Sequence, residues 1–129
     1  MMPARRRVDL AAGEQAVAAW EAARSTGEEG EAPEVSRQQL ATAVRYLVEE
    51  LVERAPGRSV EVRIPPYAAA QVIEGPRHTR GTPTNVIETD PQTWLELATG
   101  RTTWAEATAS GAVRASGQRA DLTAYLPLR

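Results

Sequence analysis

Apolar residues recur at helical spacing in the first part of the chain and predict two helices. The first is expected over about 9–24, and the second over about 36–55. Ser36 and Gln39 form a capping box at the start of the second helix, because each side chain can satisfy a backbone amide that the helix start leaves unpaired. The acidic stretch at 25–35 contains glycine and proline and is expected to be a loop between the two helices.

The spacing then changes to alternation of apolar and polar residues, which is typical of strands with one face in water. Four segments are predicted as strands: 60–64, 68–74, 85–89 and 113–116. Two short helices are expected between the third and fourth strands, with Asp90 and Thr103 as their N-caps. Three consecutive strands with short connections favour antiparallel pairing, and helices gathered on one face complete an α+β fold.

The chain has 129 residues, which suits a single domain over 1–129. Its apolar residues are unusually small, since it contains 23 Ala but only 23 Val, Ile and Leu together, and no Phe. This composition predicts a modest core. A sparse core in a small chain is compatible with self-association, so a homodimer is one expectation.

Charge and composition exclude several classes of function. The 15 basic and 17 acidic residues give a net charge of −2, which argues against a nucleic-acid-binding protein. The absence of Cys excludes disulfides and thiolate metal sites, and one His cannot build a multi-histidine metal site, so no cofactor or metal is expected. No apolar run is long enough for a transmembrane segment, and nothing resembles a signal peptide, so a cytoplasmic protein is predicted.

A polar segment between the second and third predicted strands gathers Arg77, His78 and Arg80. Arg binds carboxylate or phosphate through two parallel hydrogen bonds, so this loop predicts a site for an anionic head group. The alternative is a rigid loop whose polar side chains face water. A catalytic His78 is a further alternative, although no second acid or base is fixed beside it by spacing.

Large apolar side chains lie on the segments after the third predicted strand, which are expected to close over one face of the sheet. They are Trp94, Leu97, Trp104, Val113, Leu122, Tyr125 and Leu126. One interpretation is that they fill the core, and the other is that they contact a hydrophobic ligand. The two tryptophans suit either role, since each has a large apolar body and one hydrogen-bond donor.

The order of motifs in the last 40 or so residues resembles a known family. Asp90-Pro91 opens a helix that Gly100 ends, and then come Ser110-Gly111, an alternating strand and Gly117. This order resembles the C-terminal half of the sterol carrier protein family. The whole chain is similar to short actinobacterial members of that family.

The resemblance implies a mainly antiparallel sheet of about five strands, covered by helices and enclosing an apolar tunnel for a fatty acyl chain or a sterol. The fifth strand would come from 118–122. The family has no catalytic residues to carry over, so the implied function is non-enzymatic binding or transfer of a hydrophobic ligand. Its tail would contact the seven apolar side chains, and its head would meet Arg77, His78 and Arg80. The alternatives are a protein-interaction or accessory module, and a small enzyme using that polar loop.

Overall fold

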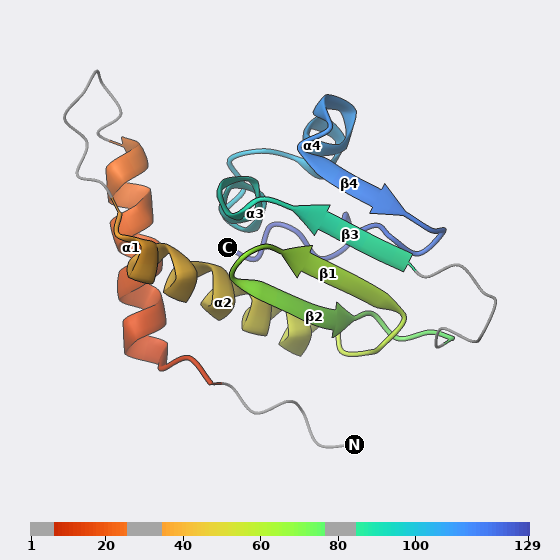
Figure 1. Ribbon diagram of the computed structural model, residues 1–129, viewed down its shortest axis with the longest axis horizontal. Helices are drawn as coiled ribbons and strands as arrows, with labels where there is room; N and C mark the ends of the chain where they lie inside the picture. Colours follow the sequence, from red (N-terminus) through yellow and green to blue (C-terminus); the bar gives the residue numbers. More distant parts are fainter. Residues whose placement is uncertain (1–6, 26–34, 77–84) are drawn as a thin grey trace.

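The computed structural model describes residues 7–25, 35–76 and 85–129 (Figure 1). Within these residues the chain forms helices and strands in one order: α1 (Leu10–Ser25), α2 (Arg37–Arg54), β1 (Val60–Ile64), β2 (Ala68–Val72), β3 (Asn85–Thr89), α3 (Pro91–Ala98), α4 (Trp104–Ser110) and β4 (Val113–Ser116). The α+β architecture predicted from the sequence is confirmed.

The predicted helices are confirmed, and so are the residues expected to cap them. The Ser36 hydroxyl accepts a hydrogen bond from the Gln39 amide at the start of α2, at 3.1 Å. The Asp90 carboxylate caps α3 in the same way, and Thr103 caps α4. Most of the predicted acidic loop, residues 26–34, lies outside the described residues.

The sheet is mixed, with the strand order β2-β1-β3-β4. The outer pairs β1–β2 and β3–β4 are antiparallel, but β1 and β3 are parallel. The prediction of a mainly antiparallel sheet is therefore wrong. The sheet differs from the prediction because β3 lies beside β1 and not beside β2. Two parallel strands need a long connection that returns the chain to the starting end of the sheet. That connection consists of β2 and the chain that follows it.

The described residues form four strands, so the prediction of about five is also wrong. Residues 118–122, the expected fifth strand, form a turn and irregular chain. The Arg119 amide donates to the Asn85 side-chain oxygen at 2.9 Å, so a side chain satisfies it instead of a neighbouring strand. The strand predicted over 68–74 ends at Val72, because Ile73 has a φ of 66° and its amide donates to the carbonyl of Ala55.

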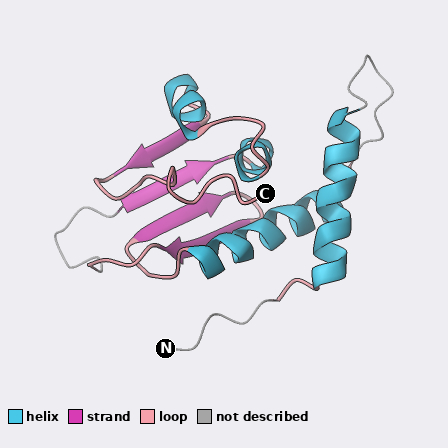
Figure 2. Cartoon of the chain, turned by 180° about the vertical axis from the view of Figure 1, so that it is seen from behind, coloured by secondary structure: helices cyan, strands magenta, loops and turns pink. Residues whose placement is uncertain are grey.

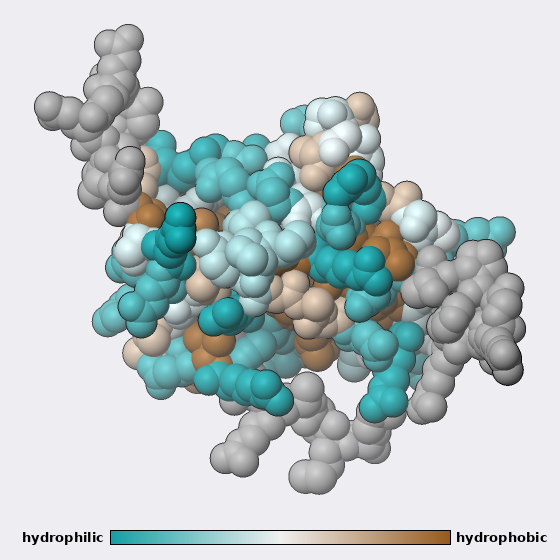
Figure 3. All heavy atoms as spheres, viewed as in Figure 1, coloured by the Kyte–Doolittle hydropathy of each residue, from teal (hydrophilic) through white to brown (hydrophobic). Residues whose placement is uncertain are grey.

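One face of the sheet is covered and the other is open. Val60, Val62 and Ile64 of β1 point to the covered face and are buried. Figure 2 shows α2 and the C-terminal segment passing over that face. The opposite face carries ion pairs such as Arg63 with Glu61, and Figure 3 shows it to be largely hydrophilic. The hydrophobic core therefore lies between the sheet and α2, α3 and the C-terminal segment.

Helix α1 packs on α2 and not on the sheet (Figure 1). The two helices touch at Gly13, where an added Cβ would lie 2.1 Å from the ring of Tyr46, so only glycine fits this crossing. Trp20 is buried, and its indole N–H donates to the Gln92 side chain at 3.0 Å. α1 is thus fixed to both α2 and α3.

Candidate functional site

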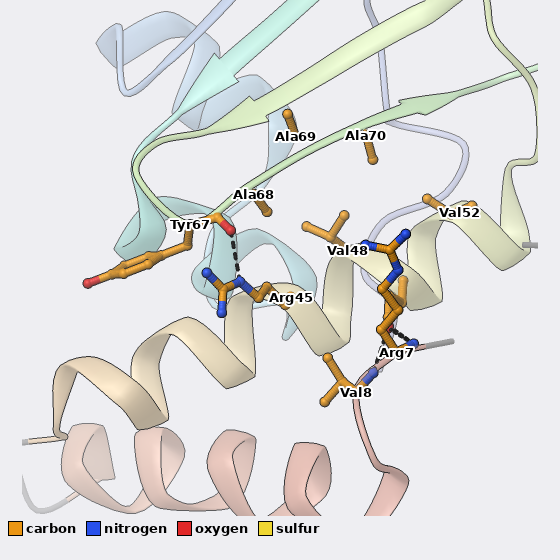
Figure 4. Close-up of a pocket in the computed structure, with 10 residues that line it drawn as sticks. Arg7, Val8, Arg45, Val48, Val52, Tyr67, Ala68, Ala69 and Ala70 are labelled. Carbon is orange, nitrogen blue, oxygen red and sulfur yellow. Dashed lines mark hydrogen bonds between the residues drawn. The ribbon is translucent and has the colours of Figure 1, made fainter. Parts of the chain in front are cut away.

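A groove of about 420 Å³ lies between α2 and β2 (Figure 4). This volume is within the range of about 300–1,000 Å³ that is usual for ligand sites in proteins. Three parts of the chain form its walls: one face of α2, strand β2 with the residue before it, and the N-terminal segment. The lining residues are Arg7, Val8, Arg45, Val48, Glu49, Val52, Tyr67, Ala68, Ala69 and Ala70.

The groove exists because β2 presents alanine where other strands present larger side chains. Ala68 and Ala70 are in register with Ile64 and Val62 of β1, so they point to the same face as the core. Their methyl groups leave space beside α2, and Val48 and Val52, one helical turn apart, form the opposite wall. The result is a groove with apolar walls that is open to solvent along one side.

Two guanidinium groups give the groove its charge. The Arg45 Nε–H donates to the carbonyl of Tyr67 at 2.9 Å, which holds this side chain at one end of the groove. Arg7 reaches into the groove from the N-terminal segment (Figure 4). Within the part of the chain that the structure describes, neither guanidinium forms an ion pair with a carboxylate.

Among the described lining residues the one carboxylate, that of Glu49, is already engaged by backbone amides. The Glu49 carboxylate accepts hydrogen bonds from the amides of Arg7 and Val8, at 2.7–3.2 Å. These bonds fix the N-terminal segment at the groove and satisfy the acid without a cationic side chain. The lining therefore combines two guanidiniums that have no carboxylate partner among the described residues with one acid that backbone amides satisfy, an arrangement that suits an anion attached to an apolar chain.

The seven apolar residues predicted to contact a ligand lie together in the core. Trp94, Leu97, Val113 and Leu122 are buried, while Trp104, Tyr125 and Leu126 are partly buried and pack against the same cluster. The indole N–H of Trp94 donates to the carbonyl of Val44 at 3.3 Å. None of the seven lines the groove between α2 and β2. Contact between these residues and a ligand stays a prediction.

The predicted head-group residues Arg77, His78 and Arg80 lie outside the described residues. Their part in binding an anion stays a prediction as well.

The residues of the groove were missed by reasoning from the sequence. Val48 has the helical spacing of a core residue, and no pattern in the sequence distinguishes Arg45 from the other charged residues. The signal that could have revealed the site is the run of Ala68, Ala69 and Ala70, because three small residues in a strand beside a helix leave space between the two elements. No local signal points to Arg7, which is far away in sequence from the other walls.

A polar network on another side of α2 joins α1 to the C-terminal residue. The Tyr46 hydroxyl donates to the Glu14 carboxylate at 2.7 Å, and Arg129 forms ion pairs with Glu14 and Glu50. Burial, followed by the hydrogen bond to Glu14, raises the pKa of Tyr46. Hydrogen bonding to Glu14 raises the pKa of Arg129. None of these groups lines the groove.

The described residues contain no group of three or more His, Asp or Glu side chains placed to hold a metal ion. None of the helices in the described ranges has both the length and the apolar character needed to cross a membrane.

A family model described as a bacterial SCP ortholog matches residues 36–128, from the start of α2 to the penultimate residue. Helix α1 and the two N-terminal residues of the groove lie outside the matched range. No curated protein matches the chain.

Proposed function

Since the chain belongs to the sterol carrier protein family, we propose that it binds or transfers an amphipathic lipid and does not alter it chemically. The family consists generally of lipid carriers rather than enzymes. The observation that carries the proposal is the groove between α2 and β2, where apolar walls meet two guanidiniums that form no ion pair with a carboxylate of residues 7–25, 35–76 or 85–129. The ligand class that fits is a fatty acyl chain with an acidic head group.

Affinity comes mainly from the chain. An acyl chain against Val48, Val52 and the alanines of β2 removes apolar surface from water, which stabilises the complex by about 25 cal/mol for each Å² buried. The head-group carboxylate pairs with the terminal nitrogens of Arg45, whose Nε is held by the Tyr67 carbonyl. Because ion pairs exposed to solvent contribute only about 0–1 kcal/mol, this pair orients the ligand more than it holds it.

The other predictions made from the sequence fit around this groove. Val44, which accepts the hydrogen bond from Trp94, lies one helical turn before Val48, so the predicted apolar contacts begin directly behind the wall of the groove. A head group served by Arg77, His78 and Arg80, a cytoplasmic location and a homodimer all remain predictions.

A fluorescent fatty acid titrated into lipid-free protein tests the proposal. We expect wild-type protein to bind it and Ala70→Trp to lose binding, because the indole fills the groove. Ala105→Trp, on the exposed surface of α4, is the matched control and should bind as wild type. No binding by the wild-type protein would contradict the proposal, and undiminished binding by a folded Ala70→Trp variant would remove the groove from it.

The same titration separates the two head-group sites. Arg45→Gln should weaken binding and Arg37→Gln should not, because Arg37 is exposed at the start of α2 and lies outside the groove. Arg80→Ala tests the loop. Loss of affinity in Arg80→Ala alone would move the head group from the groove to the loop between β2 and β3.

A further inference from the structure

Strand β2 is an edge of the sheet and forms one wall of the groove. The strand order places it at one end, and among the described residues it pairs only with β1. Beyond that pairing, no described residue hydrogen-bonds to Ala68, Ala69 or Ala70. An edge strand presents backbone N–H and C=O groups that can pair with an added chain.

The groove passes along this unpaired edge. Successive side chains of a strand point to opposite faces, so Ala68 and Ala70 point toward α2 while Ala69 points to the open face. All three nevertheless line the groove. A shallower hollow on the open face, lined by Arg63 and Glu88 among others, also includes Ala68 and Ala69. The edge of β2 is therefore accessible from both sides, and a ligand in the groove lies against its backbone.

We propose that the lipid held in the groove carries a secondary amide between its apolar chain and its carboxylate, as in an N-acyl amino acid. This inference rests on the proposed function and specifies its ligand. The amide N–H and C=O pair with the free edge of β2, as the backbone of an added strand does. The carboxylate meets Arg45, which sits beside the residue preceding β2, and the chain extends over Val48 and Val52.

The shape and charge of the groove favour this ligand over an unmodified peptide strand. A peptide added to β2 would place alternate side chains toward α2, and such recognition uses separate pockets for them. Here Val48 and Val52 form the wall opposite β2, and the lining has two guanidiniums against the one Glu49 carboxylate that backbone amides already engage. One long apolar chain and one acid match that surface.

Three ligands of equal chain length test the inference on the full chain freed of lipid: hexadecanoic acid, N-hexadecanoylglycine and its N-methyl derivative. We expect N-hexadecanoylglycine to bind about tenfold more tightly than the fatty acid, which is about 1.4 kcal/mol, because its amide forms one or two hydrogen bonds to the edge of β2. The N-methyl derivative lacks the amide donor and should lose about three- to tenfold relative to N-hexadecanoylglycine.

The outcomes distinguish the two proposals. Equal affinity for all three ligands would overturn the amide and leave the lipid-binding function standing. Binding of none would overturn the lipid-binding function, and the amide with it. Tight binding of an unacylated acidic peptide, at least equal to that of N-hexadecanoylglycine, would overturn the inference in favour of a peptide ligand.

Hydrogen exchange locates the amide without any substitution. N-hexadecanoylglycine should slow amide exchange in β2 but not in β4, which is the other edge of the sheet and serves as an internal control. Hexadecanoic acid should slow exchange in β2 much less. Equal slowing in β2 and β4, or none in either, would overturn the placement of the ligand amide on β2.

Discussion

Two sides of α2 differ in how completely they are filled. On the side that faces α1, Gly13 lies directly against Tyr46, and the charges of Glu14 and Arg129 are paired. On the side that faces β2, alanines leave a groove, and Arg45 has no carboxylate partner among the described residues. One helix thus presents a closed face that stabilises the fold and an open face with space and charge for a ligand.

The two sides of α2 also differ in how their neighbours relate to the range matched by the family model. The match begins at residue 36, so β2 and the α2 face of the groove lie inside it, while α1 lies outside. The N-terminal segment contributes Arg7 and Val8 to the groove and is fixed there by Glu49. The closed side of α2 therefore attaches an additional helix whose leading residues complete the open side.

The largest effect is expected in the core behind α2. Trp94 is 1% exposed, so Trp94→Ala should lower the free energy of unfolding by about 3–5 kcal/mol. Trp104 is only partly buried, and Trp104→Ala is the matched control with a smaller loss. Denaturant unfolding measures both. A Trp94→Ala protein that keeps wild-type stability but loses lipid binding would make Trp94 a ligand contact instead of a packing residue.

A larger side chain at the contact between α1 and α2 should lower the free energy of unfolding by a smaller amount. Gly13→Val forces a side chain against Tyr46, and overpacking of this kind lowers stability by about 1–3 kcal/mol. Ala18→Val, at an exposed position of the same helix, should change stability by no more than about 0.5 kcal/mol. Fatty-acid affinity should be unchanged in both variants. If Gly13→Val abolishes binding while the protein stays folded, the two sides of α2 are not independent.

A smaller effect is expected from the unpaired cation of the open side. Arg45→Gln should reduce fatty-acid affinity about three- to fivefold, which corresponds to the energy of a solvent-exposed ion pair. Stability should change by less than about 0.5 kcal/mol. Because exposed charges are screened by salt, the difference between wild type and variant should shrink at high ionic strength. Titration at two salt concentrations measures it, and a difference that does not depend on salt would rule out the ion pair.

The smallest effect concerns pH on the closed side. The raised pKa of Tyr46 means that the folded protein holds this proton more tightly than the unfolded chain does. Its contribution to stability is therefore complete below the ordinary pKa of about 10 and is lost as pH rises through the higher folded value. Wild type should lose stability over this range, and Tyr46→Phe should lose less. The free energy of unfolding is measured with urea at several pH values between 9 and 12. An equal loss of free energy over this pH range in wild type and Tyr46→Phe would contradict the role given to Tyr46.

The elements of this fold could be predicted because their signals are local. The capping residues Ser36, Asp90 and Thr103 and the change from helical spacing to alternation identify each helix and strand. The pairing of β1 with β3 could not be predicted, because a strand with one wet face alternates in the same way whether its neighbour is parallel or antiparallel. Residues 118–122 do not form the expected strand, because the Asn85 side chain, distant in sequence, accepts the Arg119 amide, and the amides of Ala120 and Asp121 donate to carbonyls within the same turn.

The groove could not be predicted for a related reason. It is formed because the side chains of Ala68 and Ala70 are too small to fill the space beside α2. Small side chains at two positions do not change the periodic pattern of apolar and polar residues from which elements are predicted. The two guanidiniums of the groove come from Arg7 and Arg45, on separate segments that the packing of α1 against α2 and the hydrogen bonds to Glu49 bring to the same place. The ligand contacts predicted from the sequence were large apolar side chains, and the structure places these in or against the core.

Photocrosslinking with a fatty acid that carries a diazirine at the end of its chain tests the central claim most directly. After irradiation of the complex and digestion, peptide mapping shows which residues the chain touches. The account predicts labelling on α2 around Val48 and Val52 and on β2 around Ala68–Ala70. Labelling confined to Trp94, Leu97 and the segment from Leu122 to Leu126 would contradict it, and would place the lipid inside the core instead of between α2 and β2.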